Sequence, residues 1–288
     1  MSGPKLSMWP VRPKIQEDES LTSWLTRTAN EYDYKPYMLC QIALDKKIRP
    51  NLDFDIKIKS DDLKKLSRLS GQPYNKLKDA TFLDEYFKWD RSTKLWLDCR
   101  INRPPRNARV VFCPKCITDP KQHTPYLRKE WRISYNVICK YHRIRLIEKC
   151  PICYTPFNLN SPFLLQKKLQ VCHNCDQPIR KMAIQISDQT RLDQMLINSK
   201  AISSSLINYL NNAVFEELKK QREKSSNPKV LELINPKLQS LWDCRTTPLG
   251  EMDIGLRYEL MRLTMPIYKN VINRSYDYIA NLGINILK

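Results

Sequence analysis

The sequence is poor in glycine, with only five glycines scattered along 288 residues. A glycine-rich loop that cradles phosphate cannot be assembled from them, and no Walker loop is present. The Gly-x-Ser-x-Gly turn of serine hydrolases and the combined His-x-Glu and Pro-Cys-x-x-Cys pattern of zinc deaminases are missing too. Carboxylates are plentiful, yet no compact acidic group stands out as a nuclease site. The sequence therefore favours a binding or scaffold protein over an enzyme.

A long apolar run is also missing. No stretch approaches the roughly 20 apolar residues that a membrane span requires. The opening residues MSGPKLSMWPVRPK have no apolar run after their basic residues, as a signal peptide would. We therefore expect a cytosolic protein, with no membrane contact, whose ten cysteines are reduced rather than paired in disulfides, with those in Cys-x-x-Cys and Cys-x-x-His pairs bound to metal.

Acidic residues are outnumbered, and the imbalance is concentrated. Forty-nine Lys and Arg face 30 Asp and Glu, which leaves a net charge of +19. Between Arg100 and Lys149 there are thirteen basic residues and three acidic ones. Such a bias favours a partner that carries phosphate, namely nucleic acid or a protein already bound to it. The alternative is a solvated basic face that only aids solubility.

The cysteines and histidines fall into short pairs with two intervening residues. Such pairs let two side chains converge on one tetrahedral ion, and two pairs complete a four-ligand site. The eight paired residues are Cys113, Cys116, Cys139, His142, Cys150, Cys153, Cys172 and Cys175.

Grouping the pairs by chain order predicts two structural Zn²⁺ ions, one held by three cysteines and a histidine and the other by four cysteines. A filled tetrahedral shell leaves no position for substrate, so these sites are structural rather than catalytic. Joining Cys113 and Cys116 to Cys150 and Cys153 is the alternative grouping. The sequence gives no metal role to the remaining cysteines and histidines. We expect Cys40, Cys99 and Cys244 to occupy buried apolar positions. His123 and His173 are the two histidines without a metal role.

The first hundred residues have the pattern of short helices. Ser20 is a plausible N-cap, and Leu21, Trp24, Leu25 and Thr28 mark a buried stripe, with Ser23 facing solvent. Pro36 can open a second helix that runs through Leu44. A third helix follows Ser60 and ends at Gly71, and Pro73 starts another that carries Leu77.

The helix, glycine turn and helix around Gly71 outline a helix-turn-helix. The second helix lacks the Arg, Asn and Gln row that reads base edges, and offers only Gln72 and Asn75. We therefore expect protein contact here more than sequence-specific DNA reading, and a helical bundle that binds a second copy of itself is a further alternative. The basic residues predicted to contact nucleic acid or a partner are Lys64, Lys65, Arg68, Lys76, Lys78, Arg103, Arg106, Arg109, Arg128, Lys129 and Arg132.

The fold class predicted is mainly α with small β, in three domains. Residues 1–105 form a helix-turn-helix-like helical domain, and residues 106–182 form a tandem zinc-ribbon module. In that module short strands at 110–112, 131–138 and 145–147 deliver the ligand pairs. Residues 183–288 form a C-terminal helical domain, with helices between 202 and 224 and at 230–242 and 256–275.

Several motifs occur together in a fixed order, and in combination they resemble the TniQ/TnsD family over roughly residues 9–180. They are Trp9-Pro-Val-Arg-Pro13, Glu19-Ser-Leu-Thr-Ser-Trp-Leu-Thr-Arg27, Phe112-Cys-Pro-Lys-Cys116, Tyr126-Leu-Arg-Lys-Glu-Trp131, Val137-Ile-Cys-Lys-Tyr-His142 and Leu146-Ile-Glu-Lys-Cys-Pro-Ile-Cys153.

The resemblance implies a non-catalytic, DNA-associated bacterial adaptor that selects targets for transposition. Its implied partners are a TnsC-like AAA+ ATPase, the target DNA backbone, and a CRISPR effector (Cascade or similar) with its guide RNA. Short TniQ-like members work with such effectors, and the length of this chain favours that kind. Direct recognition of an attachment site, as in longer TnsD-like members, is the alternative.

The chain departs from the family pattern after the Cys-x-x-Cys pairs, where glycine is frequent. Ile117, Tyr154 and Asp176 stand there instead. Asp tolerates a left-handed backbone better than Tyr does, so we expect the turn near Tyr154 to differ. The pair Cys139 and His142 is likewise followed by Arg143. These changes leave ligand identity intact.

Overall fold

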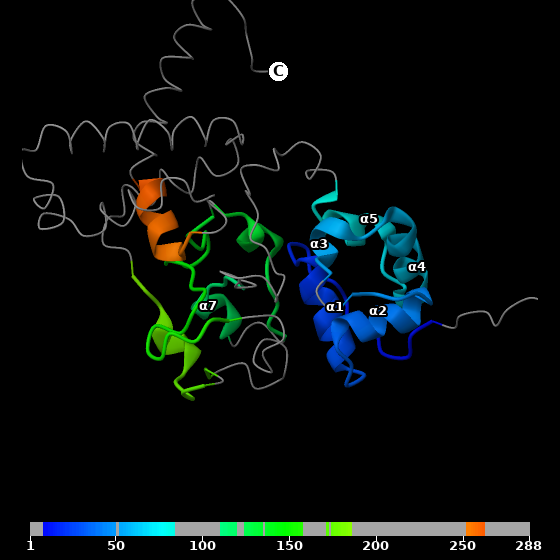
Figure 1. The fold of residues 1–288 in the computed structure, drawn as a ribbon, viewed down its shortest axis with the longest axis horizontal. Helices are drawn as coiled ribbons and strands as arrows, with labels where there is room; N and C mark the ends of the chain where they lie inside the picture. Colours follow the sequence, from blue (N-terminus) through cyan, green and yellow to red (C-terminus); the bar gives the residue numbers. More distant parts are fainter. Residues whose placement is uncertain are drawn as a thin grey trace, which may run out of the picture. The chain divides into compact units, whose positions relative to one another are not determined.

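The computed structural model describes residues 8–49, 52–83, 110–119, 124–134, 136–157, 171–172, 174–185 and 252–262. The chain divides into two compact units. Figure 1 draws the described residues as a ribbon coloured along the sequence, from blue near the N-terminus to orange at residues 252–262. Unit 1 contains residues 1–89 and 96–185, and unit 2 contains residues 90–95 and 186–288. The helical part and the cysteine-rich part, which the sequence analysis treats as separate domains, thus lie in the same unit. No helix among the described residues is long and apolar enough to cross a bilayer.

Five helices form the first part of unit 1, from α1 to α5. Ser20 caps α1 through its Oγ, which accepts a hydrogen bond of 3.1 Å from the Ser23 amide. Gly71 ends α4 in the left-handed conformation, at φ +69°. Both features were predicted, as was the start of α2 at Pro36. The bounds are α1 Leu21–Asn30, α2 Pro36–Leu44, α3 Phe54–Lys57, α4 Ser60–Ser70 and α5 Tyr74–Asp79.

The core of these helices is the predicted apolar stripe of α1 packed against α2, α4 and α5. Leu21, Trp24 and Leu25 are fully buried, together with Leu63 and Leu77. The indole of Trp9 stacks on that of Trp24 at 6.2 Å between ring centroids. Residues from both ends of the helical part therefore share one core.

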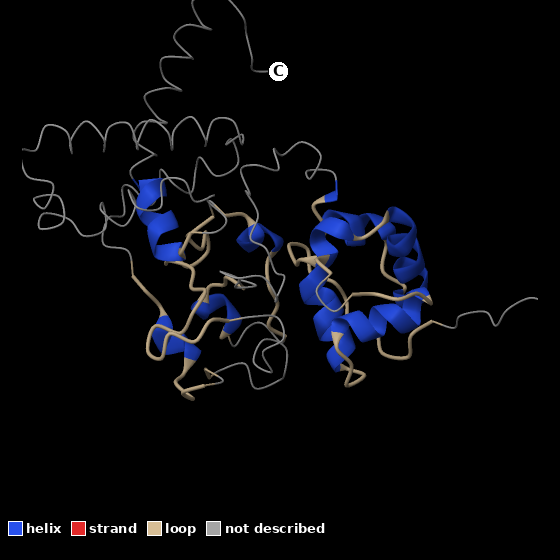
Figure 2. Cartoon of the chain, viewed as in Figure 1, coloured by secondary structure: helices blue, strands red, loops and turns tan. Residues whose placement is uncertain are grey.

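The cysteine-rich part of unit 1 contains little regular structure (Figure 2). Its helical segments are α7 (Pro114–Ile117) and the 3₁₀ turns η1 (Lys129–Arg132) and η2 (Ile179–Met182). Among the described residues β pairing is limited to isolated antiparallel bridges, such as Phe112 with Ile147 and Ile138 with Arg145. The fold is thus mainly helical with little strand, as predicted.

The strand predicted over residues 131–138 is wrong at its start. Lys129–Arg132 form a 3₁₀ turn, and the predicted strand is reduced to isolated bridge positions at Ile133 and Ile138 among the described residues. The reason is tertiary: Trp131 is 2% exposed and its neighbours dock onto the helical part, so the backbone turns instead of extending.

Within unit 2, the described residues are limited to 252–262, and residues 254–262 are helical. Leu260 and Met261 are fully buried, and the Arg257 guanidinium donates to the Met252 carbonyl at 3.1 Å. This segment overlaps the helix predicted at 256–275. The helices predicted between 202 and 224 and at 230–242 lie outside the described residues, as do Cys99 and Cys244.

Candidate functional site: two metal centres and an arginine segment

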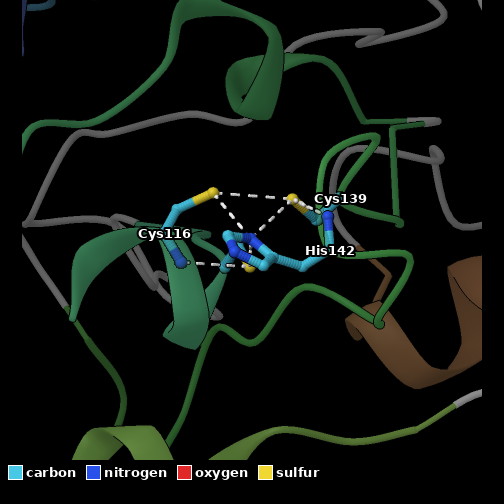
Figure 3. A group of neighbouring side chains, drawn as sticks. Cys116, Cys139 and His142 are labelled. Carbon is cyan, nitrogen blue, oxygen red and sulfur yellow. Dashed lines mark hydrogen bonds between the residues drawn. The ribbon is translucent and has the colours of Figure 1, made fainter. Parts of the chain in front are cut away.

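The first candidate metal centre joins two ligand pairs that lie on different local structures. Cys113 caps the N-terminus of α7 and Cys116 lies within it, while Cys139 and His142 lie in a turn (Figure 3). Cys116 Sγ is 3.6 Å from Cys139 Sγ and 3.2 Å from His142 Nδ1. The three cysteines are buried and the histidine is half-buried. The histidine therefore points Nδ1 into the cluster.

The second candidate centre contains four cysteines. Cys150 Sγ lies 3.7 Å from Cys175 Sγ, and Cys153 Sγ lies 3.7 Å from Cys172 Sγ. Cys150 and Cys172 are buried, whereas Cys153 and Cys175 are half-buried. The pairs are thus grouped in chain order in both centres, and the alternative cross-pairing is wrong.

The geometry of both clusters fits a tetrahedral ion with sulfur and nitrogen ligands. In each, the four ligand atoms lie within 4.8 Å of one another. Zn–S bonds of about 2.3 Å and Zn–N bonds of about 2.0 Å imply S···S edges near 3.8 Å and S···N edges near 3.6 Å. The measured separations of 3.6–3.7 Å and 3.2–3.8 Å are close to those values. Each cluster can hold a metal ion, and its donor set is the one zinc favours.

The thiols of the first cluster influence one another's pKa values. Hydrogen bonds from the Cys113 and Cys116 thiols lower the pKa of Cys139 to about 2. The same contacts, with Cys116 foremost, raise the pKa of Cys113 far above its usual value. Without an ion the cluster therefore concentrates negative charge on one sulfur. A divalent cation would let the other thiols ionise as well, which metal ligation requires.

Three of the four ligand pairs combine one hydrogen bond with a left-handed residue, and we call this combination a knuckle. In each, the amide four residues after the first cysteine donates back to that cysteine's carbonyl at 2.8–2.9 Å. The residue carrying that amide has a positive φ: +53° at Arg143, +59° at Tyr154 and +53° at Asp176. The pair on α7 differs, because Ile117 continues the helix.

The expectation that the turn at Tyr154 departs from the others is therefore wrong. Tyr154 adopts the left-handed backbone that the knuckle imposes, like Arg143 and Asp176. For a residue other than glycine this conformation costs about 1 kcal/mol or more. The knuckle hydrogen bonds and the metal-ligand geometry determine the backbone conformation here, and they hold Tyr154 at a strained positive φ.

A basic segment connects the two ligand pairs of the first centre and docks onto the helical part. We call residues 126–132 the arginine segment. Its Arg128 pairs with Asp18, and its guanidinium lies 4.2 Å from the centroid of the Tyr141 ring. The backbone also makes a contact here, because the Lys129 amide donates to the Asp18 carbonyl at 2.8 Å. The segment therefore fastens the cysteine-rich part to the helices.

Arg132 makes the most buried contact of the arginine segment. Its guanidinium bonds to both Asp53, at 2.7 Å, and Asp55. All three side chains are at most 8% exposed. Burial raises the pKa of Asp55, and the charge of Arg132 opposes that rise. Asp55 also accepts a 2.6 Å hydrogen bond from the Thr22 amide, which links the pair to α1.

A second buried pair lies at the start of α1. Glu19 is 1% exposed and accepts hydrogen bonds from Arg27 at 2.6 and 2.8 Å and from the Ser23 hydroxyl at 2.8 Å. The prediction that Ser23 faces solvent is wrong, because Ser23 is fully buried and its Oγ also accepts from the Leu127 amide. Ser23 thus connects α1 to the arginine segment.

The predicted contact residues fall into three groups. Lys64, Arg68 and Lys76 are exposed, although Lys64 pairs with Asp61 at 3.2 Å. Lys65 donates to the Leu44 carbonyl, Lys78 is half-buried, and Lys129 donates to the Asp79 carbonyl. Arg128 and Arg132 are each 7% exposed and ion-paired, so they lie inside the protein rather than on the expected contact surface. Arg103, Arg106 and Arg109 lie outside the described residues, as do His123 and His173.

The acidic partners of these arginines were not singled out from the sequence. Asp18 pairs with Arg128, and Asp53 and Asp55 pair with Arg132, whereas Glu19 pairs with Arg27 of α1. The signal for Glu19 was present in the quoted motif from Glu19 to Arg27, which contains both members of that pair.

Together, the two cysteine clusters that can hold metal ions and the docked arginine segment define a helical scaffold with two candidate metal centres. Comparison with family models identifies it further: the TniQ model matches residues 10–146. Residues 10–146 therefore form a TniQ domain, the domain of the TniQ/TnsD family of transposition-targeting proteins. The match spans the helical part and the first metal centre, and it ends before the second. No curated protein matches the chain.

Proposed function

We propose that the chain is a non-catalytic adaptor that links an RNA-guided CRISPR effector on its target DNA to a TnsC-like AAA+ regulator of transposition. The observation that supports this proposal is the TniQ match over residues 10–146. Apart from residues 90–95, the matched residues lie within unit 1, where the arginine segment joins the helices to the first centre. Two structural Zn²⁺ ions, one in each cluster, would supply the rigidity that these loop-rich parts lack.

A rigid adaptor needs surface groups with which to meet DNA and partners. Arg68 and Lys76 are exposed and flank the Gly71 turn between α4 and α5. We propose that they contact the DNA backbone or a partner's acidic surface, while the buried Arg128 and Arg132 act within the fold. The adaptor would work in the bacterial cytoplasm, on or near the chromosome. Self-association is a further proposal for this chain.

Direct recognition of an attachment site is the second candidate function. The favouring observation is the outline α4, Gly71 and α5, with Asn75 and Lys76 exposed on the second helix. The shortness of α5 counts against direct recognition, because this helix has six residues and its described side chains include no Arg or Gln. Base reading requires a longer row of such side chains in the major groove.

A co-assembly experiment tests the adaptor role. The zinc-loaded chain is mixed with the AAA+ regulator, a non-hydrolysable ATP analogue and duplex DNA, and the mass is followed by size-exclusion chromatography with light scattering. We expect a ternary complex that is lost without nucleotide and weakened when Arg68 and Lys76 are both replaced by Glu. The same measurement on the chain alone reports self-association. No association at low salt would contradict the proposal, whereas binding to one DNA sequence without the regulator would favour the second candidate.

A further inference from the structure

The knuckle of the second metal centre presents two large apolar side chains to solvent. Tyr154 is 69% exposed and Ile152 is 54% exposed, and Tyr154 is the most exposed large hydrophobic residue of the described part of the chain. They stand two residues apart in the turn between Cys150 and Thr155, whose backbone closes through a 2.9 Å hydrogen bond. A knuckle held in this way offers a rigid platform at its tip.

Among the described residues, nothing in the fold requires a tyrosine at position 154. The backbone there is left-handed, at φ +59°, and its amide donates to the Cys150 carbonyl. Glycine would satisfy both conditions without strain, and the equivalent residue of the facing knuckle is Asp176, a residue type that tolerates this conformation. A strained side chain that is mostly exposed contributes little to the fold. Such a residue is better explained by a contact outside the protein.

The charge around this tip indicates the chemistry of the contact. Residues 149–181 contain five basic residues and a single acidic one. Of these, Lys149, Arg180 and Lys181 are exposed, and Lys149 forms a β-bridge with Pro156 at the base of the knuckle. An exposed aromatic ring in a basic stretch of the sequence suits a strand whose bases stack and whose phosphates meet Lys and Arg.

We infer that the tip of the second knuckle binds single-stranded nucleic acid, with an unpaired base stacked on Tyr154, Ile152 beside it and the basic residues on the phosphates. A single strand suits the site better than a duplex, because the base faces in a duplex are covered by their neighbours. This inference does not depend on the effector or on the AAA+ regulator. It assigns a role to the part of the cysteine-rich module that lies beyond the family match.

Fluorescence anisotropy with the full zinc-loaded chain tests it, using labelled oligo-dT of about 20 nucleotides and a duplex of the same length. We expect Tyr154→Gly to weaken single-strand binding by about tenfold while duplex binding changes little. Tyr154→Phe keeps the ring and should bind as the parent does. Tyr34→Ala is the matched control, because Tyr34 is another exposed tyrosine, 41% exposed, in the helical part.

The fold of the variant is checked independently. Tyr154→Gly relieves the left-handed strain, so its thermal midpoint should equal or exceed that of the parent, with metal content unchanged. Undiminished single-strand binding in this variant would overturn the inference. An equal loss of affinity for the duplex and for the single strand would also overturn the inference. So would a variant that loses affinity for a protein partner alone.

Discussion

Replacing Cys139 by Ser is expected to abolish cooperative folding of unit 1. Cys139 is fully buried in the first centre, and its sulfur receives the His142 amide at 3.4 Å. Structural zinc contributes an apparent 10–16 kcal/mol or so of folding free energy at neutral pH in small zinc domains, which is comparable to the whole stability of a typical domain. Because the arginine segment lies between the ligand pairs, loss of the ion should also release it from the helices.

Metal content by mass spectrometry and thermal unfolding by circular dichroism measure this effect. We expect two zinc ions per parent chain and at most one in Cys139→Ser, with a lost or strongly lowered unfolding transition. Cys40→Ala is the matched control, because Cys40 is equally buried but lies in the helical core. It should keep both ions and melt cooperatively. A Cys139→Ser chain with two ions and the parental melting curve would contradict the structural role of the first centre.

The second centre should respond differently to the same treatment. Its Cys153 and Cys175 are half-buried at the periphery, and the contacts of the arginine segment do not pass through it. Cys175→Ser should therefore lose one ion while the melting transition of the helical part persists.

Arg132→Ala is expected to cost about 3–5 kcal/mol of unfolding free energy. The substitution leaves Asp53 and Asp55 buried next to each other without their shared cation. Chemical denaturation at pH 7, followed by tryptophan fluorescence, gives the value. Arg132→Lys keeps the charge but loses the forked geometry that meets two carboxylates, so an intermediate loss is expected. Arg68→Ala is the control, since Arg68 is exposed and should change stability by less than about 0.5 kcal/mol.

The loss of unfolding free energy caused by Arg132→Ala should become smaller as the pH is lowered. The pKa of Asp55 is raised by burial, and Arg132 is the main group that opposes this rise. A carboxyl with a raised folded-state pKa binds its proton more tightly in the folded chain, so it stabilises the fold below its unfolded pKa and loses that effect as pH rises. Without Arg132 the pKa rises further. A loss of unfolding free energy that stays constant from pH 7 to mildly acidic pH would contradict the burial of Asp55 beside Arg132.

Local signals in the sequence accounted for the helices and for the grouping of ligands. Ser20 and Pro36 start helices and Gly71 ends one, and each acts within a single turn. The start of α1, the start of α2 and the end of α4 therefore follow closely from them. The ligand pairs have the same character, because two residues between ligands determine the geometry of a turn. Chain order then sufficed to group them in both centres.

Contacts between distant segments could not be obtained in this way. Arg132 meets Asp53 and Asp55 across more than 75 residues of sequence, and no local pattern distinguishes a buried arginine from an exposed one. The same contacts turned the start of the strand expected over residues 131–138 into a 3₁₀ turn that ends at Arg132. At Tyr154, residue preference alone predicted a different turn, but the hydrogen bond to Cys150 outweighs that preference. Tertiary and metal constraints override local propensity at each of these places.

The central proposal, that this chain with its TniQ domain connects RNA-guided recognition to transposition, is tested most directly by mapping insertions in cells. The chain is expressed with its transposase, AAA+ regulator and effector, and the guide RNA is changed while everything else is kept constant. The account predicts that insertions move with the guide, and that they are lost when Cys139→Ser replaces the parent chain. Insertions that stay at one chromosomal sequence whatever the guide would contradict it and would favour direct recognition of an attachment site.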